Sequence, residues 1–413
     1  MRRVLRFVAG ALLGLVVSAL VFCGALLSLL RPAPGEWARP VRVGRWQVSV
    51  SVPAAMRMAT HPVLMRWLAD RPWHTAMGPV QWHAETGGDS WRVLCSPCRV
   101  RLAELGGDEI VLSRVELLAH RSAQSAWRGE FSLGDAPHAV RGRFTFGFDA
   151  HGGQVDLMLP DTPLADAYGL FAARIPELAR ARIDGRIRLD AHWQLPQRTL
   201  SVHPQMEGFA VAGLGTEALL NAAPACDAAP HGFGTWLPRA VIAAEDQRFY
   251  EHSGYDLREI AAAWSSAADP RDGARGASTL SQQVAKLVYV GDERSHLRKL
   301  RELLYAVELD RTLGKARVLN LYLAIAPWGD GRCGAASAAR HYLHKRVDKL
   351  TPMEAAWLAS LLHNPDREWS SFAQSGQINT ERVGWVLANL RPMRAERREA
   401  LVQALPEWSP PRP

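Results

Sequence analysis

The chain has 413 residues, which is enough for two or three domains of ordinary size. Hydrophobic residues make up 48% and charged residues 22%, which excludes a disordered protein, and five cysteines are too few for a disulfide scaffold or a Cys-rich zinc array. The formal net charge of +8 suits an anionic partner, such as a nucleic acid, an acidic membrane surface or a phosphorylated substrate.

The N-terminal segment predicts a membrane anchor. No charged side chain occurs from Phe7 to Leu30, a run long enough to cross a bilayer as a helix, and basic residues precede it. No convincing cleavage site follows, which favours a retained signal anchor over a cleaved signal peptide. Because basic flanks tend to stay in the cytoplasm, we expect the remainder of the chain to lie outside it. Residues 1–40 then form a cytoplasmic stub, the anchor and a linker.

Residues 41–220 show the two-residue alternation that is typical of β-strands. Apolar residues alternate with polar ones over 46–52, and the runs on either side of a Gly-Gly turn within 144–159 predict a hairpin. The strand pattern resumes over 183–202. A helix is expected to start at Asp161-Thr162-Pro163, where a capping residue precedes proline. We therefore expect a β-rich domain with at least one helix.

Two cysteines, Cys95 and Cys98, are separated by Ser-Pro in this region. They could form a redox motif or half of a zinc site. However, no second Cys pair, suitably spaced His pair or thioredoxin-like pattern accompanies them. The spacing therefore favours a local disulfide in an oxidising compartment, or two inert thiols.

Helical periodicity begins at Leu237, and the segment from Pro238 predicts a helix that stops at Ser253-Gly254. On such a helix Glu245 and Asp246 would point about 100° apart, and Phe249 would lie one turn beyond Glu245. An acid among Ala and Val and backed by an aromatic ring is desolvated, which makes it a better base near neutral pH. The alternative is a helix with a solvated charged face.

A second motif, GASTLSQQVAK, covers residues 276–286 and follows a polar stretch that is typical of a mobile loop. Thr279 and Gln282 have the spacing of a capping box, so a helix should begin here. Free backbone N–H groups at a helix start can bind a phosphate, and Lys286, two turns along, could add its charge. The alternative is a well-capped helix without a ligand.

A third helix is predicted over residues 297–313, where Arg298 and Glu302 share a face and Lys299 lies beside them. The alternative is a surface ion pair, whose Arg-before-Glu order would contribute little to helix stability. Residues 315–366 are expected to form two further helices around a glycine-rich turn.

Together these segments resemble the peptidoglycan glycosyltransferases, the lysozyme-like transglycosylases that polymerise lipid II. The family's EDxxFxxHxG motif is matched by Glu245, Asp246, Phe249, His252 and Gly254. Its GxSTxxQQ motif is matched by Gly276, Ser278, Thr279, Gln282 and Gln283, with Lys286 behind them. Its RKxxE motif is matched by Arg298, Lys299 and Glu302. A fourth motif, KxxIL..YLN, is matched by Lys315, Val318, Leu319, Tyr322 and Leu323. Ala324 and Leu287 stand where the family usually has Asn.

The patterns and the resemblance together predict an α+β multidomain protein: a transmembrane anchor, the β-rich domain, a mainly α, lysozyme-like glycosyltransferase domain over residues 221–370, and a helical tail over 371–413. It places the anchor in a bacterial inner membrane and the catalytic domain in the periplasm. The implied partners are lipid II, glycan linked to undecaprenyl pyrophosphate, the membrane and other cell-wall synthesis proteins, with no nucleic acid.

The resemblance also implies the residue roles. Glu245 is the general base on the acceptor hydroxyl, and Glu302 orients the cations that hold the leaving pyrophosphate. The remaining substrate-binding residues are Asp246, Phe249, His252, Ser278, Thr279, Gln282, Gln283, Lys286, Arg298 and Lys299. No cofactor is assigned with certainty and no residue is assigned to a metal, although Mg²⁺ or Mn²⁺ could join the pyrophosphate.

Two other functions stay open at this stage. A lytic transglycosylase or lysozyme-like enzyme also uses a catalytic Glu, but cleaving glycan requires no pyrophosphate site. An inactive envelope scaffold is the alternative from another class. A penicillin-binding transpeptidase is not expected, because the sequence has neither S-x-x-K nor K-T-G.

Overall fold

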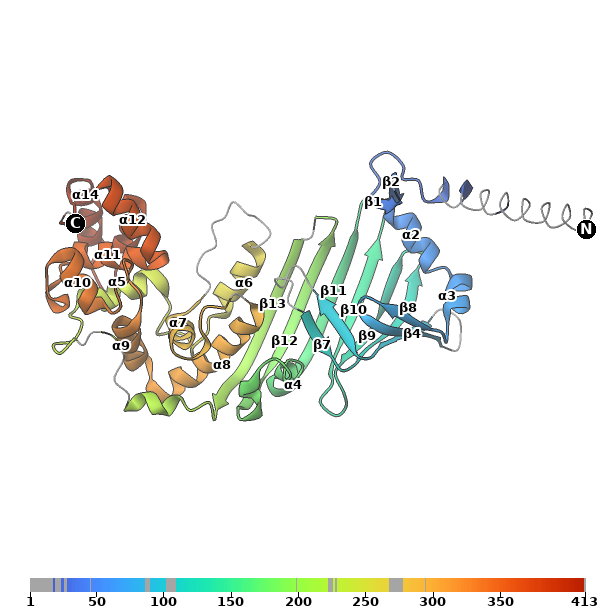
Figure 1. Ribbon diagram of the computed structural model, residues 1–413, viewed down its shortest axis with the longest axis horizontal. Coiled ribbons are helices and arrows are strands. Elements are labelled where there is room, and N and C mark those ends of the chain that lie inside the picture. The colour runs from blue at the N-terminus through green and yellow to red at the C-terminus, as the bar shows by residue number, and fades with distance from the viewer. Residues whose placement is uncertain are drawn as a thin grey trace, which may run out of the picture. The chain divides into compact units, whose positions relative to one another are not determined.

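The computed structural model describes residues 18, 24–25, 28–44, 46–85, 90–101, 109–197, 199–221, 226, 229–266, 278–293 and 295–411. The chain divides into two compact units (Figure 1). The first comprises residues 1–100, 110–160 and 188–203, and the second comprises 101–109, 161–187 and 204–413.

The first unit is built on antiparallel strands. A hairpin pairs β1 (Ala38–Val43) with β2 (Trp46–Ser51), and two short helices follow, α2 (Val52–Ala59) and α3 (Pro62–Leu68). Another two-stranded sheet pairs β6 (Cys98–Arg101) with β7 (Glu109–Leu112). The strands that make up the main sheet are β3 (Pro72–Thr75), β4 (Gly78–Ala84), β5 (Ser90–Cys95), β8 (Val115–Ala123), β9 (Ala126–Leu133), β10 (Val140–Phe148), β11 (Gly153–Pro163), β12 (Arg182–Leu195) and β13 (Thr199–Ala212).

The main sheet has the order β13-β12-β11-β10-β9-β8-β5-β4-β3, and its neighbours from β3 to β11 pair antiparallel. The predicted hairpin is confirmed, because Phe146 lies opposite Val155. The strand predicted over 46–52 is confirmed up to Ser51, whose side chain caps α2, so that Val52 is helical. A small core of Met65, Trp91 and Trp127 packs α3 against the sheet.

The helix expected at Asp161 begins three residues later than predicted. Strand β11 continues to Pro163, and α4 covers Leu164–Gly169. Asp161 does not cap the helix, because both its side chain and its carbonyl oxygen accept hydrogen bonds from Arg186 on β12. This pairing keeps Asp161 in the extended conformation of the sheet.

The two cysteines of β5 and β6, Cys95 and Cys98, form a disulfide, which confirms the local pairing that the sequence favoured. A second disulfide joins Cys226 to Cys333. It was not predicted, because its two cysteines are 107 residues apart and no local pattern connects them.

Apart from the residues of β6, β7, β11, β12 and β13 that belong to it, the described part of the second unit is mainly helical. Its helices after α4 are α5 (Trp236–Glu245), α6 (Leu257–Ser266), α7 (Leu280–Ala285), α8 (His296–Leu313), α9 (Lys315–Ile325), α10 (Ala335–Leu343), α11 (Pro352–Ser360), α12 (Pro365–Ser375), α13 (Thr380–Ala388) and α14 (Ala395–Ala404). Residues 315–366 contain α9 and α10 around the glycine turn, as expected, and also α11, which the prediction of two helices missed. A capping box between Thr351 and Glu354 starts this third helix.

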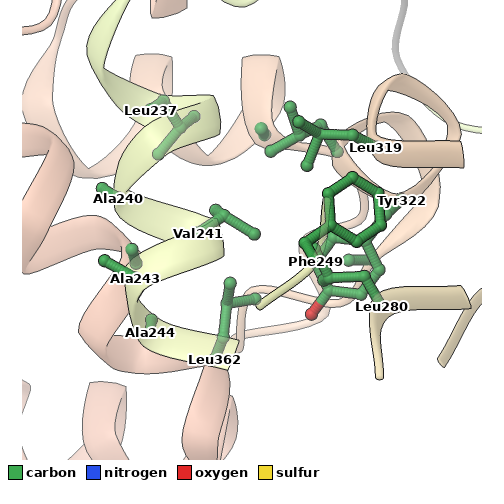
Figure 2. Packing of buried hydrophobic residues seen from close by; sticks show 14 of the residues in the cluster. Leu237, Ala240, Val241, Ala243, Ala244, Phe249, Leu280, Leu319, Tyr322 and Leu362 are labelled. Atoms are coloured by element: carbon green, nitrogen blue, oxygen red, sulfur yellow. The ribbon is translucent and has the colours of Figure 1, made fainter. Parts of the chain in front are cut away.

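One hydrophobic core unites most of these helices. Leu237, Val241 and Ala244 of α5 belong to it with buried side chains from other elements, among them Phe249 and Leu280, and Val241 points toward these two (Figure 2). Val383, Val386 and Leu387 of α13 belong to the same core, so the residues after 370 pack with the helices before them. Burial of this apolar surface is the main force that holds the helices together.

Among the described residues, no helix is both long and apolar enough to cross a membrane. Most of the predicted anchor, Phe7 to Leu30, lies outside the described residues, as do Gly276 and most of the predicted loop before it. The anchor therefore stays a prediction.

Candidate active site

The chain leaves the helical conformation directly after Glu245, which corrects the prediction of one helix up to Ser253-Gly254. Asp246 has φ −161° and ψ 75°, outside the helical region. Its carboxylate accepts the backbone N–H of Leu280 at 2.9 Å and lies 2.9 Å from Nε2 of His252. These two contacts stabilise the bend and join the end of α5 to the start of α7. Glu245 is therefore the last residue of α5.

The turn after α5 is packed tightly. Phe249 is fully buried, and Nζ of Lys315 lies 4.5 Å from the centre of its ring. Lys315 also approaches Nδ1 of His252 at 3.3 Å. Gly254 has φ +87°, and a Cβ added there would lie 2.4 Å from the carbonyl oxygen of Ala306, so the turn requires glycine. Phe249 and His252 therefore shape the turn and do not extend a helix.

The capping box of α7 is confirmed in both directions. The Thr279 hydroxyl accepts the N–H of Gln282, and the Gln282 side chain accepts the N–H of Thr279. Two of the N–H groups expected to bind a phosphate at this helix start have partners within the protein. The N–H groups of Leu280 and Gln282 already donate to Asp246 and Thr279, so they are not free for a ligand. The start of α7 thus serves to position the side chains around it.

Glu245 lies in a polar network inside the core. Its side chain is 13% exposed. Nε2 of Gln283 donates to Oε2 of Glu245 at 3.0 Å, and the Tyr322 hydroxyl donates to the amide oxygen of Gln283 at 3.0 Å, which fixes the orientation of the amide. Nη2 of Arg382 lies 3.5 Å from Oε1 of Glu245. The carboxylate is therefore oriented from two sides.

Burial raises the pKa of Glu245 above the ordinary value of 4.5, and the nearby charge of Asp246 acts in the same direction. The hydrogen bond from Gln283 and the charges of Arg382 and His363 oppose this rise. A carboxylate with a raised pKa is a stronger base than an exposed one. Glu245 is therefore suited to accept a proton.

Glu302 lies in a different environment, because it is fully paired with cations. Its side chain is 1% exposed, with Oε1 at 2.7 Å from Nη1 of Arg298 and Oε2 at 2.8 Å from Nζ of Lys299. Lys299 also donates to the Ser278 hydroxyl at 2.6 Å. The alternative of a surface ion pair is wrong, since Glu302 is buried and Arg298 is 15% exposed. The cluster presents positive charge held by one buried carboxylate.

Lys286 follows α7 and forms an ion pair with Asp292 at 2.7 Å. The side chain is part exposed, so it can exchange this partner for another anion. Leu287, one of the two departures from the family motifs, is exposed, whereas Ala324, the other, is buried. Neither departure removes a polar contact of Glu245 or Glu302.

Helix α8 is held from its other side by residues that sequence reasoning missed. Glu177 is buried, and its Oε1 accepts two hydrogen bonds from Arg301, the neighbour of Glu302. About two turns further along, the Glu308 carboxylate accepts the N–H of Leu214. Both partners of α8 precede the glycosyltransferase motifs in sequence. Their contacts fix the position of the helix that carries Arg298, Lys299 and Glu302.

The described residues do not fit a resident metal site. No group of three or more His, Cys, Asp or Glu side chains among them could hold a metal ion. Both oxygens of Glu302 are occupied by Arg298 and Lys299. The Mg²⁺ or Mn²⁺ expected at the pyrophosphate stays a prediction.

Comparison with known proteins agrees with this arrangement. Residues 228–391 match the model of the family described as Transglycosylase. The chain carries a transglycosylase domain. A biosynthetic peptidoglycan transglycosylase of Nitrosomonas eutropha is 42% identical over 142 residues, 34% of this chain and 58% of the relative. A protein of the same name from Klebsiella oxytoca is 43% identical over 161 residues, 39% of this chain and 66% of the relative.

The chain thus spans between 58% and 66% of the length of these curated relatives. Both carboxylates and all the predicted substrate-binding residues lie inside the transglycosylase domain, as does Arg382. Sequence reasoning missed Arg382, because it is 137 positions from Glu245 and belongs to a segment taken as a tail. Glu177 lies outside the domain. Residues 41–220 have no counterpart in the matched region.

Proposed function

We propose that the chain is a peptidoglycan glycosyltransferase that polymerises lipid II into β-1,4-linked glycan and releases undecaprenyl pyrophosphate. The observation that carries this proposal is the difference between its two buried carboxylates. Burial raises the pKa of Glu245, which has no full ion pair, whereas Glu302 is neutralised by two cations. Paired carboxylates in such different environments typically perform different tasks.

The proposed reaction is a displacement with inversion. Glu245 takes the proton of the 4-hydroxyl of the acceptor sugar, while that oxygen attacks the anomeric carbon of the lipid-linked donor. The bond from this carbon to the pyrophosphate oxygen breaks, and the electron pair leaves with the pyrophosphate. Arg298 and Lys299 stabilise the charge that develops there, and Glu302 and Ser278 hold Lys299 in place.

A glycan-cleaving enzyme is the runner-up. Hydrolytic or lytic cleavage releases a sugar hydroxyl, a poor leaving group that needs a proton, so cations around a buried carboxylate would not help it. The cluster of Arg298, Lys299 and Glu302 therefore favours the use of a pyrophosphate donor. An inactive scaffold would need neither the network of Glu245 nor this cluster.

We also propose that the chain is anchored in the bacterial inner membrane with the transglycosylase domain in the periplasm, and that it has no transpeptidase activity. The charge-free run from Phe7 to Leu30 supports the anchor. The disulfides Cys95–Cys98 and Cys226–Cys333 support an oxidising compartment. The absence of S-x-x-K and K-T-G from the sequence supports the lack of acyl transfer.

The test is polymerisation of lipid II by the purified full chain and by Glu245→Gln. General-base catalysis contributes roughly 10²–10⁴-fold, so the variant should lose at least that much turnover. Because burying the charge of Glu245 opposes folding above its ordinary pKa, Glu245→Gln should melt no lower than wild type at neutral pH. Near-normal polymerisation by the variant would refute the assignment, and shortening of preformed glycan by wild type would favour the cleaving enzyme.

Glu302→Gln separates the two roles. The substitution keeps the size of the side chain but removes the charge that holds Arg298 and Lys299. We expect a raised KM for the lipid-linked donor together with a lowered kcat, and an unchanged acidic limb of the pH profile, because the proton acceptor is intact. A changed acidic limb of the pH profile with an unchanged donor KM would show instead that Glu302 is the proton acceptor and that Glu245 is not.

A further inference from the structure

Helices α2 and α3 belong to the first unit (Figure 1), and both expose large apolar side chains. Val63 and Trp67 lie one turn apart on the same side of α3 and are 65% and 59% exposed. Met65, on the opposite side, is buried against the sheet. The helix therefore has a second apolar side that no described residue covers. Further exposed apolar residues lie nearby in sequence, namely Val41, Met58, Trp73 and Met77.

The same segment is strongly basic. Residues 38–77 contain six arginines and only one acidic residue, Asp70. The guanidinium of Arg71 lies 4.9 Å from the centre of the Trp67 ring, and Arg66 neighbours Trp67 on α3. Tryptophan and arginine side by side are typical of surfaces at the boundary between lipid and water, where the ring enters the lipid and the cation binds phosphate.

The position of these helices in the chain indicates that the membrane covers their exposed apolar side. The carbonyl oxygen of Leu30, the last residue of the predicted anchor, accepts the N–H of Ser51 at 2.7 Å. Ser51 is fully buried and its side chain caps α2. Helices of 8 and 7 residues rise about 12 and 10 Å, and with the two residues that join them Trp67 lies within about 40 Å of the point where the anchor ends. If Leu30 is at the membrane surface, α2 starts beside that surface and α3 follows one helix later.

We propose that α2 and α3 form a membrane-contact surface, which lies on the anionic lipid headgroups at the foot of the anchor. Val63 and Trp67 enter the interfacial layer, and Arg66 and Arg71 bind lipid phosphates. The membrane contact of the first unit is then made by two elements, the anchor and this surface, and the unit is held in a fixed orientation to the bilayer. The proposal rests on the predicted anchor and does not depend on glycosyl transfer.

The experiment places an environment-sensitive fluorophore at position 63 in the full chain (Val63→Cys, with Cys23→Ser). The other four cysteines are paired in disulfides. The protein is reconstituted into vesicles of phosphatidylcholine, with or without phosphatidylglycerol, that carry brominated acyl chains as quenchers. The matched control carries the fluorophore at Met158→Cys, an apolar position of the same unit that is 47% exposed.

We expect a blue shift and loss of fluorescence at position 63, greatest with phosphatidylglycerol, and neither change at position 158. The pair Arg66→Glu/Arg71→Glu should reduce the quenching at 63 to that in phosphatidylcholine alone. Arg141→Glu/Arg143→Glu, two exposed arginines of β10, should leave it unchanged.

Four results would overturn the proposal. Unquenched fluorescence at 63 in a chain that floats with the vesicles would refute the membrane-contact surface and agree with the anchor. A chain that does not float would refute both. Equal quenching in the two lipids, unaffected by the arginine variants, would refute binding to anionic headgroups. Shielding of position 63 without vesicles would indicate a second copy of the chain as the occupant. Polymerisation of lipid II by the same sample reports separately on the proposed function.

Discussion

At the scale of single residues, the chemistry of the site depends on the different partners of the Glu245 and Glu302 carboxylates. Both are buried, yet Glu302 has a cation at each oxygen, whereas Glu245 has an amide at one oxygen and a longer contact with Arg382 at the other. Desolvation therefore dominates at Glu245 and raises its pKa. The same residue type becomes a base at one position and a holder of cations at the other.

Arg382 is expected to set the pH at which Glu245 becomes active. Its charge favours the ionised carboxylate and so lowers the pKa that burial has raised. Arg382→Gln removes this charge, the pKa of Glu245 rises further, and the acidic limb of kcat/KM should move to higher pH. The measurement is the pH profile of lipid II polymerisation. Arg367→Gln, at an exposed arginine of α12, is the matched control and should leave the profile unmoved. A shift in the control, or none in Arg382→Gln, would contradict this role.

At the scale of elements, short helices are positioned by contacts at their ends. Asp246 ties the end of α5 to the start of α7, and Thr279 both caps α7 and donates to the carbonyl oxygen of Gly254. Helix α8 is longer and is held along its length, by Glu177 at Arg301 and by Glu308 at Leu214. Because Glu302 is the neighbour of Arg301, the contact with Glu177 sets where the cation cluster lies.

We expect Glu177→Gln to destabilise the helical unit by about 1.5–3 kcal/mol, the usual range for a hydrogen bond to a charged group. The substitution leaves Arg301, which is 25% exposed, without its buried partner. Chemical denaturation gives the loss, and the double variant Glu177→Gln/Arg301→Leu should lose less than the sum of the single variants.

The matched control for Glu177→Gln is Asp348→Asn, which breaks the pair with Arg346, whose side chain is 55% exposed. It should lose at most about 1 kcal/mol. Strict additivity in the double variant, or equal losses in Glu177→Gln and the control, would show that Glu177 does not hold α8 through Arg301. A raised donor KM in Glu177→Gln would connect this contact to the cation cluster.

At the scale of the whole molecule, the transglycosylase domain is completed by segments outside its family match. Cys226 lies two residues before that match, and its disulfide to Cys333 closes a separation of 107 residues that contains α5, α6, α7, α8 and α9. Cross-linking distant residues removes conformations from the unfolded chain, and more of them for longer loops. The disulfide therefore stabilises the part of the chain that contains both carboxylates.

Cys226→Ser/Cys333→Ser is expected to lower the stability of the helical unit by about 2–4 kcal/mol. Thermal denaturation with and without a reductant measures the loss, and reduction of wild type should reproduce it. The matched control is Cys95→Ser/Cys98→Ser, which removes a disulfide between cysteines only 3 positions apart. It should lose much less stability, because the loop that this disulfide closes is short. Equal losses from the two pairs would contradict the dependence on loop length.

Much of the site could be predicted from the sequence, because its chemistry is carried by short motifs. The capping box of Thr279 and Gln282 and the pairing of Arg298, Lys299 and Glu302 follow from spacing along one helix, since residues three and four apart are neighbours there. The strands of 144–159 follow from alternation. The sequence also located Glu245 as a desolvated acid, although it placed the residue within a helix that ends there.

What the sequence by itself determined is therefore local: which residues are catalytic candidates, where most strands and helices lie, and which side chains share a helix face. Only the tertiary structure decided that α5 ends at Glu245, that Arg382 approaches this carboxylate, that Glu177 holds α8 and that Cys226 pairs with Cys333. Each of these depends on partners tens to more than a hundred positions away. No helical or strand period connects such positions, because only the packing of a shared hydrophobic core brings them together.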